Sequence, residues 1–522
     1  MTAPAEFDVA APAPTVHSGN RLPRGVALVI GILIVSTFIV FLNELLLGVA
    51  LPTLIEDFGV TPSTGQWVTT GFLLTMAVLI PASSFVMRRF RMRTVFLVAL
   101  SLFIAGTTLA AIAPTFGVLV AGRIVQASGT AVFLPLLMTT TMRLVPVGRR
   151  GQMMAITTAV PAVAPAVGPA LSGLVLSTLN WRWLFIMMLP FAVAALALGA
   201  WKLRDTTTPE PAALDVPSLL LSAFGFGGLV YGLSLIGEAS SGHTSISPYL
   251  PLAVGLVGLV AFVLRQIPLQ RRDSAFLDMR IFLRRSFTAP LLVMLFVAGN
   301  GIGLLVVLPL VLTDVTGLST LQLGLFLIPG GAAISIVAAA SGRVYDRFGP
   351  RPLMIPAAIV WLAVLWFLSR VDESTSVVAL IVAWLVFTSA QAAMWATLTT
   401  SAMGGLRPEL YPHGASAFAT AQQLAGAAFG AVFISAYTIG SGVRDAGVLS
   451  TDQATSAGHA AFLTAGVVGL IVLLGAFFVR RTPIPAAEGT VVDAPVAFAP
   501  LTVETVADTT ATDGAVGEKV AR

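Results

Sequence analysis

Long apolar runs constrain the fold of this chain more than any other feature. A helix needs about 20 apolar residues to cross a bilayer, and fourteen runs reach that length. The chain is 57% hydrophobic and only 10% charged, which leaves too little polar surface to cover a soluble core. We therefore expect an all-α polytopic membrane protein. The runs are approximately 25–51, 66–87, 94–113, 116–142, 151–178, 181–201, 217–237, 248–267, 287–312, 321–341, 353–369, 376–403, 414–440 and 459–479.

The arginines indicate how the chain is oriented. Clusters such as Arg88–Arg93 follow the even-numbered runs, whereas the opposite side carries only Arg182, Arg370 and Arg444. Cytoplasmic loops carry an excess of positive charge, so both termini are expected in the cytoplasm. The alternative is that the clusters bind lipid or nucleic acid; the alternation favours topology, and we expect no nucleic-acid partner.

Several kinds of chemistry find no support in the sequence. The chain has no cysteine, which excludes disulfides, thiolate catalysis and cysteine-ligated zinc. No two of its four histidines have the spacing of metal ligands, and no Gly-rich loop ends in Lys-Ser/Thr to hold phosphates. We therefore expect no metal, no cofactor and no enzymatic activity. The run Gly299–Gly303 imitates a dinucleotide motif, but it lies in an apolar segment and fits helix packing better.

Two halves of the chain repeat each other at a shift of 257–258 residues. Asn43 recurs as Asn300, Asp57 as Asp314, and Arg89-Phe90 as Arg347-Phe348. Repeated halves that enclose a site at the midplane are a transporter architecture. The expected organisation is a disordered cytoplasmic tail (1–24), a six-helix bundle (25–201), a linker with two extra spans (202–286), a second six-helix bundle (287–479) and a disordered cytoplasmic tail (480–522).

The loop after the tenth run carries the most specific motif. Its residues Gly342, Asp346, Arg347, Gly349 and Arg351 match G-x-x-x-D-R-x-G-x-R, which resembles the cytoplasmic loop signature of the major facilitator superfamily. The resemblance implies a latch that closes the cytoplasmic gate; the alternative is a plain charged turn. Physically, Asp346 can pair with arginines or accept from a helix N-terminus.

The first-half copy of this loop is broken. Ser84 replaces its glycine and Arg88 replaces its aspartate. An acid-based latch is therefore not expected in the first half.

Two further spans resemble motifs of the same superfamily. Arg123 and Gln126 belong to a match to R-x-x-Q-G-x-G, in which Ala127 replaces a glycine. The fifth run resembles the antiporter motif of exporters, although Ala164 replaces a glycine; a generic kinked packing helix is the alternative. The residues of that motif are Pro165, Gly168, Pro169 and Gly173.

The first run contains an acid, Glu44, in an otherwise apolar segment. A charge at the bilayer centre costs roughly 3 kcal/mol, so such residues are usually functional. Residues 42–52 resemble the first-span motif of fourteen-span drug:proton antiporters, with Asn43 replacing the aspartate. The Asn43-Glu44 variant is similar to lincomycin-type multidrug exporters. The resemblance implies a major facilitator fold of two six-helix bundles plus two central helices.

Glu44 and Arg123 form the expected proton-coupling pair. Each lies about seven residues, or about 11 Å, from the outer end of its span. Burial disfavours a charged carboxylate and a neighbouring guanidinium favours it, so these opposed effects could let Glu44, the expected proton carrier, bind and release a proton near working pH. The alternative is a permanent ion pair that only joins two spans.

Further polar residues inside the spans suit a mostly apolar cavity with a few polar anchors. The alternative for each is hydrogen bonding between helices. The candidates for the substrate cavity are Asn43, Gln126, Asn300, Gln391, Trp395, Gln422 and Gln423.

The resemblance implies a proton-coupled multidrug efflux antiporter of a bacterial inner (plasma) membrane, which exports amphipathic or cationic compounds by alternating access. Its expected partners are small amphipathic molecules, protons and the lipid bilayer, and a monomer is expected. Two alternatives stay open: a proton-coupled transporter of one native metabolite or lipid, and a membrane sensor that transports nothing.

The arginine pattern generates a first test. Reporter fusions at residues 242 and 278 should report opposite sides of the membrane, because one span separates these loops. Position 278 should be cytoplasmic. Equal sidedness of the two fusions would contradict the fourteen-span topology.

Overall fold

The computed structural model describes residues 24–479, apart from 61, 66, 204, 206–208, 210–214, 241–246, 272–273, 319 and 443–449. Both expected tails lie outside the described residues, except Arg24, which starts the first helix. The described residues form helices and no strand. Thirteen helical stretches are long and apolar enough to cross a membrane, and a further long helix, α6 (Arg150–Thr178), occupies the fifth apolar run. The protein is therefore an all-helical polytopic membrane protein.

The helices fall into three sequential groups. We call the first group the N-terminal bundle, the second the extra helices and the third the C-terminal bundle. The N-terminal bundle has α1 (Arg24–Phe58), α2 (Pro62–Gly65), α3 (Trp67–Arg89), α4 (Met92–Ala111), α5 (Phe116–Leu144), α6, α7 (Trp183–Ile186) and α8 (Leu189–Lys202). The extra helices are α9 (Val216–Ser222), α10 (Gly228–Ser240) and α11 (Tyr249–Gln270). The C-terminal bundle has α12 (Arg285–Thr316), α13 (Thr320–Phe348), α14 (Arg351–Leu368), α15 (Val377–Gly404), α16 (Tyr411–Ser441) and α17 (Thr451–Ala476).

Two of the expected spans are not single α-helices. The sixth is split into α7 and α8, and Pro190 opens α8; proline lacks an N–H and tolerates only the first turn of a helix. The seventh contains a π-helical turn over Ala223–Gly227. The apolar pattern predicted the length of both spans but not these breaks.

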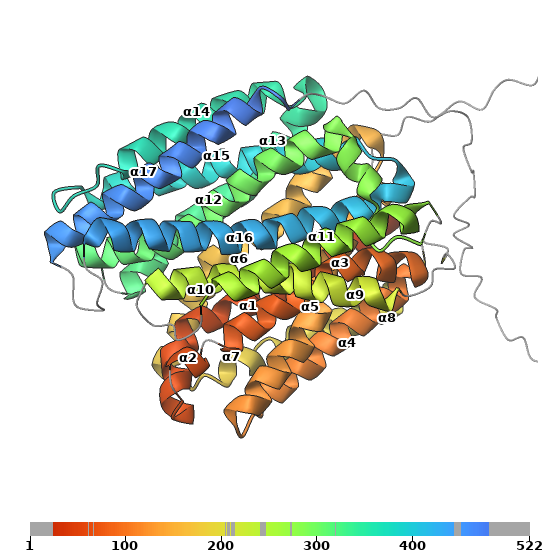
Figure 1. The fold of residues 1–522 in the computed structure, drawn as a ribbon, viewed down its shortest axis with the longest axis horizontal. Helices are drawn as coiled ribbons and strands as arrows, with labels where there is room; N and C mark the ends of the chain where they lie inside the picture. The colour runs from red at the N-terminus through yellow and green to blue at the C-terminus, as the bar shows by residue number, and fades with distance from the viewer. Residues whose placement is uncertain are drawn as a thin grey trace, which may run out of the picture. The chain divides into compact units, whose positions relative to one another are not determined.

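The extra helices lie beside the contact between the bundles. In the arrangement of Figure 1, α10 packs against α3 and α16, α9 packs against α3, and α11 packs against α9 and α10. Glycines let α10 and α11 pack closely against each other: a Cβ on Gly228 of α10 would lie 2.8 Å from Gly255 of α11. Asp215 begins α9 and is joined to Arg265 of α11 at 2.7 Å. The hydrogen bond from Arg265 lowers the pKa of Asp215 to about 2, although burial opposes this shift.

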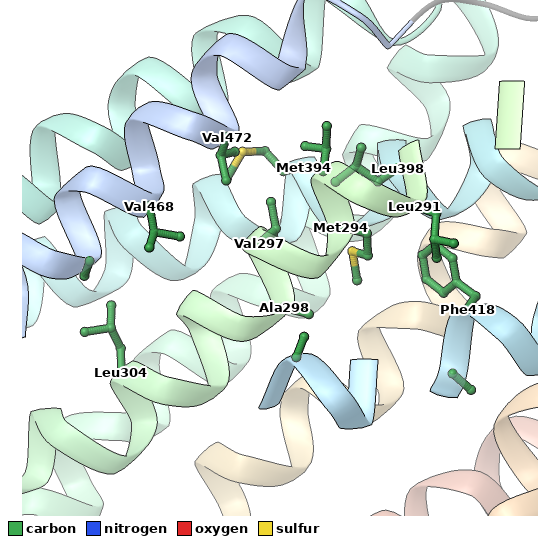
Figure 2. Packing of buried hydrophobic residues seen from close by; sticks show 14 of the residues in the cluster. Leu291, Met294, Val297, Ala298, Leu304, Met394, Leu398, Phe418, Val468 and Val472 are labelled. Atoms are coloured by element: carbon green, nitrogen blue, oxygen red, sulfur yellow. The ribbon is translucent and has the colours of Figure 1, made fainter. Parts of the chain in front are cut away.

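Interdigitated apolar side chains form the interior of the C-terminal bundle. Figure 2 shows Val297 of α12 beside Met394 of α15 and Val472 of α17. All three side chains are buried. Burying a side chain of this size stabilises a helix contact through close packing and dispersion, which fixes α12 between its two neighbours.

The sequence repeat corresponds to a repeated contact. Asn43 on α1 donates from Nδ2 to the Leu184 carbonyl at 3.5 Å, and Asn300 on α12 donates to the Ala465 carbonyl at 2.9 Å. In each bundle, an amide of the first spanning helix therefore binds the backbone of the last. These bonds satisfy the two amide nitrogens, which would be costly to leave unpaired in the membrane.

One end of the molecule is rich in arginine, and the two bundles meet there. We call it the arginine-rich end: α3 and α13 finish there, and α6 and α14 begin there. The Asp346 carboxylate of α13 accepts hydrogen bonds from the backbone N–H groups of Gly151 at 2.9 Å and Gln152 at 3.1 Å. These groups form the N-terminus of α6, whose partial positive charge favours an anion.

Close backbone approach makes this contact possible. A Cβ on Gly342 would lie 2.7 Å from the Gly151 carbonyl oxygen, so α13 meets α6 where glycine is present on both sides. Ser416 of α16 adds a hydrogen bond to the Ile80 carbonyl of α3 at 2.7 Å. Among the described residues, every hydrogen bond between the N- and C-terminal bundles lies at the arginine-rich end.

The geometry predicts the effect of Asp346→Asn. The variant has one acceptor oxygen and turns an NH₂ group toward two N–H donors, so it should favour opening of the arginine-rich end. Loss of about 1 kcal/mol would raise the open-to-closed ratio about fivefold. The chain has no cysteine, so spin labels at Thr94→Cys and Glu409→Cys, both exposed positions, report the distance cleanly.

Asp452→Asn is the matched control, because Asp452 is exposed and lies in the first turn of α17. An unchanged distance distribution in Asp346→Asn would show that the carboxylate does not stabilise closure.

Candidate transport cavity

A cavity of about 460 Å³ lies between the two bundles. Its walls come from α1, α3, α5, α6 and α10 on one side, and from α12, α13, α15 and α16 on the other. Most of the lining is apolar, which is typical of a ligand site with a few polar anchors. The polar and indole-bearing lining residues are Glu44, Thr69, Arg123, Trp384, Thr388, Gln391, Trp395, Gln422 and Gln423.

Glu44 is the single acid among the described residues that line the cavity. It lies on α1 and is partly exposed. Its Oε2 is shielded from solvent and accepts no hydrogen bond from a described residue. A carboxyl group with unused acceptor capacity in an apolar cavity can take up a proton or bind a cation.

Arg123 lines the same cavity from α5 but is held by neutral groups. Its side chain is 1% exposed. It donates to the Gln126 Oε1 atom and, at 3.4 Å, to the Val68 carbonyl, and its guanidinium lies 4.0 Å from the centre of the Phe72 ring. Neutral acceptors and an aromatic face therefore surround the charge.

The expected direct pair between Glu44 and Arg123 is absent from this structure. No ion pair within 4.0 Å joins the two described side chains, although their charges are close enough to interact. Other groups compete with Glu44 for the guanidinium: it donates hydrogen bonds to Gln126 and Val68 and lies over the ring of Phe72. The permanent ion pair considered from the sequence is thus not the arrangement found here.

Gln126 connects three helices instead of lining the cavity. Its Nε2 donates to Asn43 Oδ1 at 2.7 Å and to Thr107 Oγ1 at 2.7 Å. Gln126 and Asn43 are 0% and 1% exposed, and neither lines the cavity. Asn300 is also fully buried and bound to the Ala465 carbonyl. These three residues were expected to line the cavity, but in this structure the amide nitrogen of each donates to another helix instead.

The four other cavity candidates do line the C-terminal side. Gln391 and Trp395 lie on α15, and Gln422 and Gln423 lie on α16. Gln391 donates to the Val297 carbonyl at 3.4 Å. Its amide packs against Gly301, where a Cβ would clash with it. The glycines of α12 therefore make room for cavity side chains.

The sequence analysis missed Trp384 and Thr388, which also line the cavity. Both lie on α15 with Gln391 and Trp395, at spacings of four, three and four residues. Such spacing places all four on one helix face. The helical spacing could have predicted them, because they lie within two turns before Gln391 on the same face of the helix.

The helix with the antiporter-like motif packs beside Glu44. Gly168 of α6 lies against Leu45, where an added Cβ would be 3.1 Å from the Leu45 Cβ. Ser172 donates to the Leu46 carbonyl at 2.7 Å. Gly173 has no neighbour within 4 Å of a Cβ position, and the side chains of Pro165 and Pro169 lie outside the described residues. α6 thus supports the segment of α1 that carries the acid.

The remaining loop residues shape the end of α13. Gly349 has φ +81° and follows the last helical residue, so it ends the helix in the left-handed conformation that glycine favours. Arg347 lies over the neighbouring Phe348 ring at 5.2 Å, and the Arg351 side chain is exposed. The loop thus directs Asp346 toward α6 and these two arginines toward the surface.

Comparison with known proteins connects this architecture to a family. The family model described as Major Facilitator Superfamily matches residues 33–431. The chain is 34% identical to the uncharacterized MFS-type transporter YcnB of Bacillus subtilis (90% of this chain, 98% of the relative). It is 35% identical to the lincomycin resistance protein LmrB of Listeria monocytogenes (87% and 96%).

Solved structures show the same fold at low sequence identity. The human organic anion transporter MFSD10 aligns with a TM-score of 0.62 at 17% identity, covering 88% of this chain and all of that one. The proton:xylose symporter XylE aligns with a TM-score of 0.60 at 14% identity, covering 88% and 96%. The family model covers most of the chain, and the chain therefore belongs to the major facilitator superfamily of membrane transporters.

Proposed function

We propose that this protein is a proton-coupled multidrug efflux antiporter that exports amphipathic, cationic compounds by alternating access. The observation that carries the proposal is Glu44, the single acid among the described lining residues of an apolar cavity between the bundles. The Listeria monocytogenes relative named as a lincomycin resistance protein supports this class of function.

The cavity offers different chemistry on its two sides. Glu44 supplies a carboxyl group from α1, while Gln391, Gln422 and Gln423 supply neutral amides from the C-terminal bundle. Trp384 and Trp395 add indole rings, which can stack on aromatic groups and attract cations. A compound with a positively charged amine and an apolar aromatic body fits this distribution.

Competition at Glu44 would couple proton and substrate. A carboxylate attracts a cation, whereas the protonated acid does not, so proton and cationic substrate exclude each other. Arg123 stabilises the carboxylate by its charge and is fixed by Gln126, so it need not leave its place when Glu44 binds a proton. Uptake of a proton would release the substrate, and loss of the proton would restore the binding site.

The closed arginine-rich end indicates which conformational state of the transport cycle the structure represents. We propose that this end faces the cytoplasm, in accordance with the positive-inside rule, and that the cavity here belongs to a state closed toward the cytoplasm. A proton from outside would then reach Glu44 first. Separation of Asp346 from α6 would open the cytoplasmic side and allow deprotonation there.

Glu44→Gln tests the proposal. The variant keeps the size and hydrogen-bonding capacity of the side chain but cannot carry the proton. Gradient-driven efflux of cationic dyes from everted vesicles, and substrate-induced proton release in detergent, should both be lost. Binding of neutral substrates should survive. Glu56→Gln is the matched control on the same helix, because Glu56 is exposed at the end of α1.

Normal proton release from a folded Glu44→Gln variant would overturn the carrier role. A panel of dyes, antibiotics and lipids addresses the substrate. Transport of one compound alone would favour the alternative of a dedicated metabolite or lipid transporter. No transport of any compound, with intact folding, would favour a sensor.

A further inference from the structure

Five described residues of the segment that joins the extra helices to the C-terminal bundle are buried at the arginine-rich end. Ala275, Phe276, Leu277 and Asp278 are each at most 6% exposed, and Ile281 is 0% exposed. Connecting loops usually run over the surface, because their backbone polar groups need partners. The burial of this segment, residues 275–281, which we call the wedge, therefore needs a structural reason.

The wedge binds the N-terminal bundle through α3. Ser84 donates a hydrogen bond from Oγ to the Phe276 carbonyl. The next residue, Phe85, stacks on the Phe276 ring with centroids 6.0 Å apart and planes inclined by 10°. Ser84 stands where the intact copy of the loop motif has a glycine, so the broken motif contributes a contact of its own.

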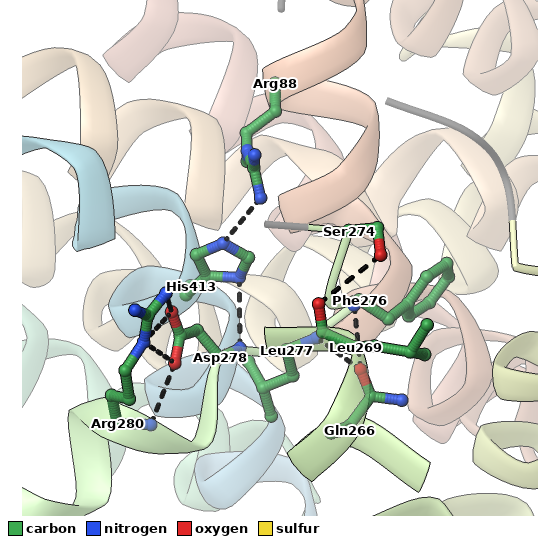
Figure 3. A network of polar contacts seen from close by, with 9 residues as sticks. All are labelled: Arg88, Gln266, Leu269, Ser274, Phe276, Leu277, Asp278, Arg280 and His413. Atoms are coloured by element: carbon green, nitrogen blue, oxygen red, sulfur yellow. Dashed lines mark hydrogen bonds and ion pairs between the residues drawn. The ribbon is translucent and has the colours of Figure 1, made fainter. Parts of the chain in front are cut away.

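The wedge also meets the C-terminal bundle at His413 of α16. Figure 3 shows the imidazole between Arg88 and the wedge: Arg88 Nη1 lies 3.2 Å from Nε2, and the Asp278 N–H points at Nδ1 at 3.4 Å. Guanidinium and backbone N–H groups only donate, and a neutral imidazole has one acceptor nitrogen. The neutral imidazole on α16 can therefore accept a hydrogen bond from only one of these two donors, Arg88 of α3 or the wedge, at a time.

Gln266 of α11 fixes the wedge from the side of the extra helices. Its Oε1 accepts from the backbone N–H groups of Phe276 at 2.8 Å and Leu277 at 3.2 Å. Its Nε2 donates to Ser218 Oγ of α9 at 2.7 Å. These bonds involve only the wedge and the extra helices, so Gln266 can be changed without removing a hydrogen bond from either bundle.

The charged residue of the wedge is satisfied internally. Burial disfavours the carboxylate of Asp278, but hydrogen bonds from the Arg280 side chain and backbone outweigh this and lower its pKa. The two side chains approach to 2.6 Å. The Asp278 carboxylate is thus neutralised by Arg280 within the wedge and does not need a partner on α3.

We propose that the wedge is a second latch at the arginine-rich end. It takes the place of the acid that the first-half loop lacks, since Arg88 stands at the position that corresponds to Asp346. Gln266 is the positioning residue, and one role of the extra helices is to hold the wedge between α3 and α16. Opening of this end requires the wedge to leave one of the two helices.

This inference rests on the proposed function only for its place in a transport cycle. Closure by the wedge is a property of the protein without substrate or proton gradient. A distance measurement on the resting protein therefore tests it separately from any transport assay.

Gln266→Leu tests the wedge in the full-length chain. The variant removes both acceptor bonds to the wedge backbone and should raise the ratio of open to closed distances about fivefold between labels at Thr94→Cys and Glu409→Cys, the ratio for losing roughly 1 kcal/mol. Gln270→Leu is the matched control: it lies one turn later on α11, and its Oε1 is buried and accepts no hydrogen bond from a described residue.

A second variant approaches the wedge from α3. Ser84→Ala removes only the bond to Phe276 and the local bond to Pro81, so it should shift the distances in the same direction, by less, even if Gln266→Leu does not fold. Unchanged distances in the folded variants would overturn the proposal. An equal shift in Gln270→Leu would overturn it too, since it would assign the effect to general loosening of α11.

Discussion

Polar groups inside a membrane must find partners within the protein, because lipid offers none. This constraint separates the polar residues of the spans into two kinds. Asn43 and Gln126 bind each other, and Gln126 also fixes Arg123, so these groups join α1 to α5 as part of the architecture. Glu44 is the next residue after Asn43 but turns into the cavity, where its Oε2 accepts no hydrogen bond from a described residue. Its unused capacity distinguishes it from its structural neighbours.

The same constraint explains how the two bundles are joined. Their hydrogen bonds lie at the arginine-rich end, where the Asp346 carboxylate binds a helix N-terminus and the Ser416 hydroxyl donates to a backbone carbonyl. Near the cavity, the contacts between bundles are side-chain packing without such bonds among the described residues. Hydrogen bonds are directional, so the closed end has a defined geometry, while apolar packing around the cavity can adjust to ligands of different shape.

The sequence predicted the helical class and the spans because hydrophobic length and period carry that information. The breaks between α7 and α8 and within the seventh span depend on local backbone geometry, which an apolar pattern does not record. Glu44, Gln391 and Gln423 were found because polar atoms in apolar runs stand out. Asn43, Gln126 and Asn300 stand out equally, and their neighbours in space, such as Ala465, decide that they face other helices. The wedge was not predicted for the same reason: its burial depends on Ser84 and His413, which are remote from it in sequence.

Gly342 and Gly151 have a mechanical consequence. Backbone meets backbone at this point, since a Cβ on Gly342 would lie 2.7 Å from a carbonyl oxygen. No flexible side chain lies between the two main chains at this point. The contact is therefore rigid, and α13 and α6 cannot approach each other more closely. One methyl group added there would act as a spacer that keeps α13 and α6 apart. The contact of α13 with α6 is thus sensitive to a change of a few atoms, far from Glu44 and the cavity.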